Sequence, residues 1–207
     1  MVAMLSVENL QKTYFKGRFD RTPTFSLKAD FQIEEPSIVG MMGPNGSGKT
    51  TLFELITGSN SPTGGTVRVQ GKDIHKIRTD QRDRLAIHYH QSYQVRSFRS
   101  LKPNFMLQRS GSDYPQVHLF DEPQFNTQDG YIGFMLDFFR ELRNQGRLVF
   151  LCVHPNERFH LEILQEICEQ FIFVQKGVVT QHSSYEDILN YQPARDYLGD
   201  LLEARAA

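Results

Sequence analysis

The sequence lacks several features that mark proteins other than ordinary globular ones. Only two cysteines occur in 207 residues, and the formal net charge is −1. No apolar run approaches the roughly 18 residues that cross a bilayer. A disulfide-stapled scaffold and a membrane-spanning protein are therefore excluded, and we expect no nucleic-acid partner because bulk attraction to polyanions is missing.

The chain also lacks the composition shifts that mark linkers, and it contains no internal repeat. Its length suffices to bury about 70% of the unfolded surface, so residues 1–207 are expected to form one domain. Cys152 and Cys168 lie in apolar, regularly patterned stretches, which predicts buried thiols in a reducing compartment. The first residues have no basic region followed by an apolar core, so a cytoplasmic protein is expected.

The most specific pattern in the sequence is a glycine-rich stretch at residues 43–51. It reads Gly43-Pro44-Asn45-Gly46-Ser47-Gly48-Lys49-Thr50-Thr51 and fills every fixed position of the phosphate-binding pattern G-x-x-x-x-G-K-[ST]. The apolar run 38–42 before it is typical of a strand covered on both faces. Apolar residues at helical spacing follow as far as Gly58, which suits a helix C-terminus. The stretch therefore predicts a site for a nucleoside triphosphate.

The residue types of this stretch fit that chemistry. Glycines let the backbone fold around an anion with its N–H groups pointing inward, and the following helix adds the positive end of its dipole. Lys49 is expected to reach the β and γ oxygens, and the Thr50 hydroxyl is expected to bind Mg²⁺. The alternative is a glycine-rich turn with an incidental lysine.

Apolar spacing also predicts the other elements of the chain. A polar loop at residues 16–21 joins the first two expected strands. Strands are expected at residues 5–14, 25–33, 66–70, 86–90, 117–121 and 148–153, and helices at residues 79–85, 131–142 and 185–189.

Several short motifs stand beside these elements in a fixed order. They are residues 5–10 with Tyr14, residues 62–65 and 71–74, Gln91, the acid pair Asp121-Glu122 at the end of an apolar strand, and His154. Together with the phosphate loop they resemble the ATP-binding cassette (ABC) ATPases over nearly the whole chain. The resemblance implies an α/β fold, with a P-loop NTPase core whose mainly parallel sheet is flanked by helices, and an antiparallel N-terminal β subdomain.

The resemblance also implies roles for single residues. Asp121 would hold Mg²⁺ directly or through water, and Glu122 would act as the general base on the attacking water. His154 would donate to the γ-phosphate, Gln91 would contact Mg²⁺ or water, and Tyr14 would stack on adenine. The alternatives are a strand-to-loop cap for the acids, ordinary packing for His154 and an edge-strand tyrosine for Tyr14. The remaining phosphate-loop positions, Gly43, Asn45, Gly46, Ser47, Gly48 and Thr51, would bind the nucleotide.

The sequence departs from the ABC pattern between Gln91 and Asp121, which are only 30 positions apart. The Leu-Ser-Gly-Gly-Gln signature is missing there, and residues 92–116 are expected to be a shortened remnant of the helical subdomain. Residues 125–129 follow where the family has its dimer-contact loop. Two schemes could complete the ATP site: a partner ABC ATPase with an intact signature, or a second copy that offers Ser100 with Arg96, Arg99 and Lys102.

The resemblance therefore predicts a Mg-dependent ATPase that acts as the ATP-binding subunit of an ABC system. The expected partners are a second ATPase subunit in a dimer and a transmembrane permease, at the inner face of the cell membrane. Two alternatives stay open: a nucleotide-gated assembly or regulatory protein without a transporter, and an ATP-binding scaffold that hydrolyses little.

Overall fold

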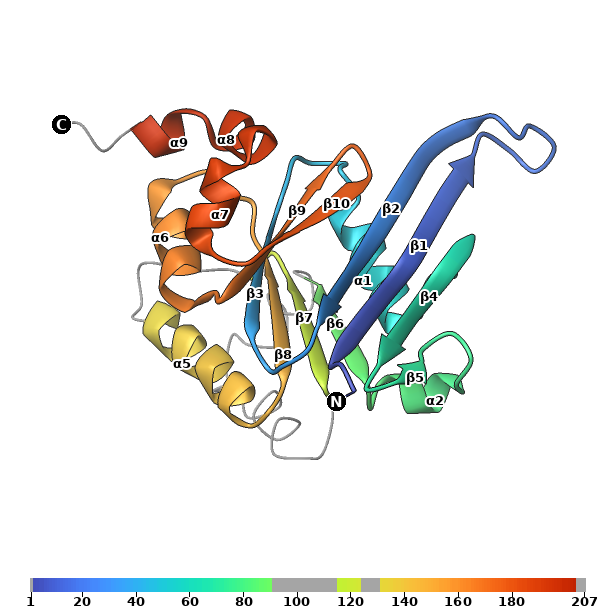
Figure 1. Ribbon diagram of the computed structural model, residues 1–207, viewed down its shortest axis with the longest axis horizontal. Helices are drawn as coiled ribbons and strands as arrows, with labels where there is room; N and C mark the ends of the chain where they lie inside the picture. The colour runs from blue at the N-terminus through green and yellow to red at the C-terminus, as the bar shows by residue number, and fades with distance from the viewer. Residues whose placement is uncertain (1, 91–114, 124–130, 204–207) are drawn as a thin grey trace.

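The fold is taken from a computed structural model that describes residues 2–90, 115–123 and 131–203 (Figure 1). Its strands are β1 (Leu5–Phe15), β2 (Pro23–Ile33), β3 (Ile38–Met42), β4 (Gly64–Val69), β5 (Lys72–Asp73), β6 (Ala86–His90), β7 (Val117–Asp121), β8 (Leu148–Cys152), β9 (Gln170–Gln175) and β10 (Val178–His182). Its helices are α1 (Lys49–Thr57), α2 (Thr79–Arg82), α5 (Tyr131–Asn144), α6 (Arg158–Ile167), α7 (Tyr185–Asn190), α8 (Gln192–Leu198) and α9 (Asp200–Glu203).

The strands form a ten-stranded mixed sheet in the order β5-β4-β1-β2-β10-β9-β3-β8-β7-β6. From β9 to β6 all neighbours are parallel, whereas β1, β2, β4 and β5 pair antiparallel. The predicted α/β fold with an antiparallel N-terminal part is confirmed. The two parts are joined into one sheet because β10 pairs antiparallel with β9 and parallel with β2.

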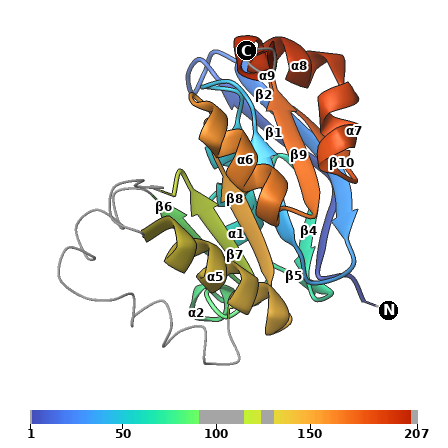
Figure 2. The same cartoon turned by 90° about the vertical axis from the view of Figure 1, so that its left-hand side faces the viewer.

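The sheet is covered on both faces by apolar side chains. One cluster joins α1 to the inner faces of the antiparallel strands and of β3, β7 and β8, while the other joins α5, α6, α7 and α8 to the opposite face. Figure 2 shows α5 and α6 lying across that second face. Val39 and Met41 belong to the first cluster and Ile38 and Met42 to the second, which is why residues 38–42 read as a continuous apolar run.

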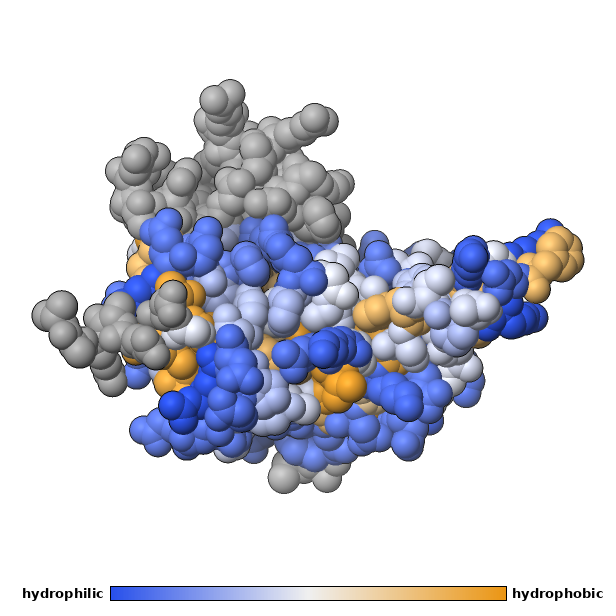
Figure 3. All heavy atoms as spheres, turned by 90° about the horizontal axis from the view of Figure 1, so that it is seen from above, coloured by the Kyte–Doolittle hydropathy of each residue, from blue (hydrophilic) through white to orange (hydrophobic). Residues whose placement is uncertain are grey.

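One helix is shorter than the sequence predicts, and one predicted loop carries an exposed aromatic ring. The helix predicted at residues 79–85 ends at Arg82, because residues 83–85 turn the buried Leu85 side chain into the core ahead of β6. The loop at residues 16–22 is polar as predicted, but Phe19 at its tip is 94% exposed. In Figure 3 this hairpin projects at the right of the molecule.

Some sequence-based predictions fall outside the described residues and stay predictions. They concern Gln91, residues 92–114 of the expected helical remnant, and residues 125–129. None of the helices described is long and apolar enough to cross a membrane.

Candidate nucleotide-binding site

Three neighbouring parallel strands carry predicted site residues at one edge of the sheet. The phosphate loop follows β3, Asp121 ends β7 and is followed by Glu122, and His154 follows β8. The strand β6, which pairs with β7, ends at the same edge. Because these strands are parallel neighbours, their carboxyl ends meet at the same edge, where ligands bind in open α/β sheets. In Figure 1 the loop between β3 and α1 lies at the upper end of β3.

The phosphate loop is held by backbone contacts that require its glycines. Gly43 has φ +150°, and a Cβ there would lie 2.0 Å from the carbonyl oxygen of Val174 in β9. Gly48 is left-handed at φ 112° and caps the start of α1. The Ser47 carbonyl accepts a hydrogen bond of 3.0 Å from the Gly177 N–H in the turn between β9 and β10. The loop is therefore fixed by the neighbouring strand and turn.

Two buried polar groups of the loop face its interior. The Lys49 ammonium donates to the carbonyl oxygens of Gly43 at 2.6 Å and Pro44 at 2.9 Å, although the residue is only 8% exposed. The Ser47 hydroxyl is buried and has no hydrogen-bond partner among the described residues. The Lys49 ammonium and the Ser47 hydroxyl could both donate to an anion bound in the loop, beside the backbone N–H groups of its glycines.

Asp121 connects this loop to the acid strand. The Thr50 hydroxyl donates to Asp121 Oδ2 at 3.0 Å, and the His88 Nε2 lies 3.2 Å from the same oxygen. The His88 ring also meets the Phe53 ring edge-on, with 5.3 Å between their centroids. Two donors from different elements therefore fix the orientation of one carboxylate.

The electrostatics of Asp121 favour its charged form. Burial alone raises its pKa, but hydrogen bonds from His88, Cys152 and Thr50 outweigh burial, and the pKa lies below its usual value. Burial raises the pKa of the Cys152 thiol well above its usual value, so that neighbour stays neutral. An ionised carboxylate beside a threonine hydroxyl is a hard-oxygen donor pair of the kind that Mg²⁺ prefers, so these residues fit the expected ion.

Glu122 extends from the end of β7 with a strained backbone. Its φ is +52°, a left-handed conformation that costs a non-glycine residue about 1–2 kcal/mol. Its N–H donates to the Cys152 carbonyl at 2.9 Å, which holds the residue there. The side chain is exposed beside the buried Asp121, so the two adjacent acids have different environments. Strain of this kind clusters at functional sites.

His154 is half-buried beyond β8 and is engaged by the C-terminal helices. Its Nδ1 lies 2.7 Å from the Tyr197 hydroxyl in α8, and the two ring centroids are 6.1 Å apart. Burial raises the pKa of Tyr197 to about 12, with the Cys152 thiol adding to the shift. The phenol is therefore protonated at neutral pH.

Tyr14 and Phe25 face each other across β1 and β2. They are register partners, and their ring centroids are 6.2 Å apart. The Tyr14 hydroxyl accepts from Asn60 Nδ2 at 2.7 Å, and the Lys12 ammonium lies 5.1 Å from the Tyr14 ring centroid. The Phe25 ring lies against Gly48, since a Cβ on that glycine would come within 2.9 Å of it.

The phosphate loop, Phe25 and the acid pair surround one pocket of about 250 Å³. It is lined by Phe25, Asn45, Gly46, Gly48, Lys49, Thr50, Thr51, Asp121 and Glu122. The lining combines a glycine loop, one lysine, a threonine hydroxyl and two carboxylates. That arrangement can hold a phosphate chain with a divalent ion.

Comparisons with known proteins agree with this site. The sequence model of the ABC transporter family matches residues 27–110. The chain is 37% identical to the spermidine/putrescine import ATP-binding protein of Thermobifida fusca over 82 residues, which are 40% of this chain and 21% of the relative. It is 22% identical to the L-cystine import ATP-binding protein of Bacillus subtilis over 90% of this chain and 93% of the relative. These comparisons show that the chain is similar to the ATP-binding proteins of ABC transporters.

Solved structures show the same fold. A dimeric ATP-binding cassette in a post-hydrolysis state with ADP and phosphate superposes with a TM-score of 0.63 at 16% identity, covering 87% of this chain and 98% of that one. The cbiO1 protein of Clostridium perfringens gives 0.66 at 16% identity, covering 100% and 96%. Among the sequence relatives, the Thermobifida protein is matched over only about a fifth of its own length.

The structure brings most of the predicted site residues together. The phosphate loop, Asp121 and Glu122 line one pocket, and His154 follows the neighbouring strand. Tyr14 is the register partner of Phe25 across β1 and β2 but does not line the pocket. Phe25 is the only aromatic residue among the described residues that line it.

Three residues near the site were missed by sequence reasoning. His88 lies in the predicted strand 86–90, so its place near the strand end was readable. Phe25 could have been found from its pairing with Tyr14. Tyr197 carried no signal, because its contact with His154 depends on how α8 folds back over the sheet.

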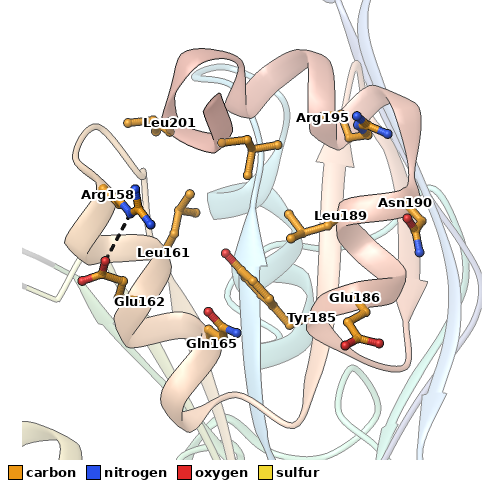
Figure 4. Close-up of a pocket in the computed structure, with 11 residues that line it drawn as sticks. Arg158, Leu161, Glu162, Gln165, Tyr185, Glu186, Leu189, Asn190, Arg195 and Leu201 are labelled. Atoms are coloured by element: carbon orange, nitrogen blue, oxygen red, sulfur yellow. Dashed lines mark ion pairs between the residues drawn. The ribbon is translucent and has the colours of Figure 1, made fainter. Parts of the chain in front are cut away.

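Two of the pockets formed by the described residues lie away from the phosphate loop. One, of about 360 Å³, lies between the end of α1, α2 and the start of β6, and includes Thr79, Arg82 and His88. The other, of about 560 Å³, lies between α6 and the C-terminal helices. Figure 4 shows Leu161 and Leu189 facing each other across it, with the Arg158–Glu162 ion pair at its rim.

Proposed function

We propose that this chain is the ATP-binding and hydrolysing subunit of an ABC system that serves a membrane transport complex. The observation that carries the proposal is the Thr50–Asp121 contact of 3.0 Å, which joins the phosphate loop to the acid strand. The match to the ABC transporter family over residues 27–110 and the printed functions of the relatives, which are import ATP-binding proteins, support the transport role.

The nucleotide is held by the residues of the pocket. The phosphate chain lies in the loop 43–48, with Lys49 turning from the loop carbonyls to the phosphate oxygens and Ser47 donating to them. Thr50 and Asp121 hold Mg²⁺, which supplies charge neutralisation on the phosphates. His88 keeps the Asp121 carboxylate in place by its contact with Oδ2.

Hydrolysis is assigned to the acid that follows. The exposed Glu122 carboxylate takes a proton from a water molecule as its oxygen attacks the γ-phosphorus, and the bond to the bridging oxygen of ADP breaks. His154 donates from its free ring nitrogen to the γ-phosphate. Both residues follow neighbouring strands of the sheet, so they approach the phosphate from the same edge.

A binding measurement tests the nucleotide site. Isothermal titration calorimetry with Mg-ATP is expected to show saturable binding that Lys49→Ala abolishes, because the loop loses its point cation. Lys72→Ala, which removes an exposed cation on β5, serves as the matched control and keeps full affinity. Equal affinity in Lys49→Ala and the parent would refute the site.

The docking surface for a permease is assigned to the pocket beside α2. Thr79, Arg82 and Asp83 line it together with the end of α1 and the start of β6. The pocket is open, as suits a contact that is small. Because His88 borders both this pocket and Asp121, the surface is connected with the nucleotide site.

Recovery of partners from native membranes separates this role from its alternatives. A crosslinker placed at Thr79 or Asp83 is expected to capture a multi-spanning permease, whereas one placed at Glu186 on the opposite C-terminal side is not. Capture only from Glu186 would refute the docking surface. Isolation of the intact protein with soluble proteins alone would instead favour a regulatory or assembly role.

A further inference from the structure

The contact between α8 and His154 gives the C-terminal helices a role in the proposed hydrolysis. We infer that Tyr197 is a positioning residue: its hydroxyl donates to Nδ1 of His154 and so places the ring proton on Nε2. The inference rests on the proposed function, since it concerns the state in which His154 meets the γ-phosphate. It requires no further ligand or metal.

The direction of the hydrogen bond follows from the chemistry of the two groups. The Tyr197 hydroxyl keeps its proton at neutral pH, because burial moves its pKa to about 12. A phenol is a strong donor and a poor acceptor, whereas an unprotonated imidazole nitrogen is a good acceptor, and the 2.7 Å separation is that of a well-formed bond. In its neutral form the ring then carries its hydrogen on Nε2, which can donate to an anion.

The surroundings of Tyr197 make this orientation a fixed one. Its ring packs against Phe173 of β9 with a centroid separation of 5.8 Å, and α8 is anchored by the buried Ala194 and Leu198 on either side. Phe173 pairs with Met42, the last residue of β3 before the phosphate loop. The hydroxyl is therefore held by the same strands that hold the loop.

A cavity lies on the other side of the C-terminal helices. The cavity of about 560 Å³ between α6 and α7–α9 is lined by Arg195, two residues before Tyr197. Figure 4 shows Arg195 at one end of this cavity and Leu161 of α6 at the other.

The first test reads the tautomer without nucleotide. In the folded full-length protein, long-range proton–nitrogen correlation spectra are expected to show His154 protonated on Nε2 alone. Tyr197→Phe keeps the ring but removes the donor, and should give a mixture of tautomers. Tyr191→Phe, whose ring also packs on Phe173 at 5.9 Å, is the control and leaves the His154 signals unchanged. Protonation of Nδ1 in the parent protein, or an unchanged tautomer in Tyr197→Phe, would overturn the inference.

The second test connects the contact to turnover. Tyr197→Phe is expected to lower kcat about tenfold, the effect of losing one hydrogen bond, while KM for Mg-ATP stays within twofold. In a His154→Ala background the same change should have no further effect. An equal loss in both backgrounds would mean that Tyr197 acts only through folding and would overturn the role. Absence of ATP binding in the parent would refute the proposed function but leave the tautomer result standing.

Discussion

At the scale of single residues, the site is defined by polar groups whose environments differ although they are neighbours in sequence. Asp121 is buried and held by Thr50 and His88, whereas Glu122 is exposed and left-handed. This difference separates a carboxylate fixed for metal binding from one free to take a proton. His118, on the same strand, is a third case, because it is buried and neutral.

His118 makes folding stability depend on pH. Burial, reinforced by the Arg147 guanidinium, lowers its pKa to about 3, whereas an unfolded histidine titrates near 6.5. As the pH falls through 6.5, the unfolded chain gains a proton that the folded chain refuses, so stability is full above this pH and is lost toward pH 3. Between pH 7 and pH 5 the loss is about 2 kcal/mol.

The measurement is urea unfolding of the parent and of His118→Gln at both pH values. The variant should lose about 2 kcal/mol less than the parent between pH 7 and pH 5, whatever its absolute stability. His75 and His160, whose pKa values are also lowered by burial, contribute equally to both proteins. The same pH dependence in both would contradict the assignment of a buried neutral ring.

At the scale of elements, the turn between β9 and β10 positions the phosphate loop. Gly177 has φ +77°, and a Cβ on it would lie 1.8 Å from the Ser26 carbonyl of β2. Its N–H donates to Ser47 in the loop, and its carbonyl accepts from Lys28 at 2.7 Å. The turn therefore fastens the antiparallel part of the sheet to the loop.

Substitution of this glycine should affect both stability and binding. Gly177→Ala adds a steric clash of about 1–3 kcal/mol to the left-handed strain and should also weaken Mg-ATP binding, because the turn must move away from Ser47. Gly146→Ala is the matched control, with φ +81° and open space around it. Denaturant unfolding and calorimetry compare the two, and equal losses with unchanged ATP affinity would contradict the role of the turn.

The same scale shows what the sequence could and could not predict. The strand–loop–helix unit of residues 38–58 was readable because an apolar run covered on both faces and a glycine pattern are local signals. The pairing of β10 with β2, which joins the two halves of the sheet, rests on one register pair, Val178 with Lys28, and has no local signal. The role of Tyr197 likewise depends on a contact between distant segments, because its hydroxyl meets His154 43 positions earlier in the chain.

At the scale of the whole molecule, the proposed ATP site is open on one side and calls for a second subunit. The pocket exposes Thr50, Asn45 and Gly46, so a bound γ-phosphate would keep one charged face uncovered. We therefore expect two copies of this chain to associate around ATP.

Light scattering on the purified chain tests this expectation. Glu122→Gln, which should retain ATP, is predicted to form a dimer at saturating Mg-ATP, and Lys49→Ala in the same background should stay monomeric. A chain that remains monomeric at saturating ATP, yet hydrolyses it once a signature-bearing ABC ATPase is added, would contradict the homodimer and indicate an asymmetric pair.

The most direct test of the account is the rate of phosphate release from Mg-ATP by Glu122→Gln. The amide keeps the shape of the side chain but cannot take a proton, so ATP affinity should stay close to that of the parent while turnover falls at least about a hundredfold. That result would establish the pocket at the ends of β3 and β7 as the hydrolytic site. Turnover equal to that of the parent, with ATP bound equally well, would contradict it.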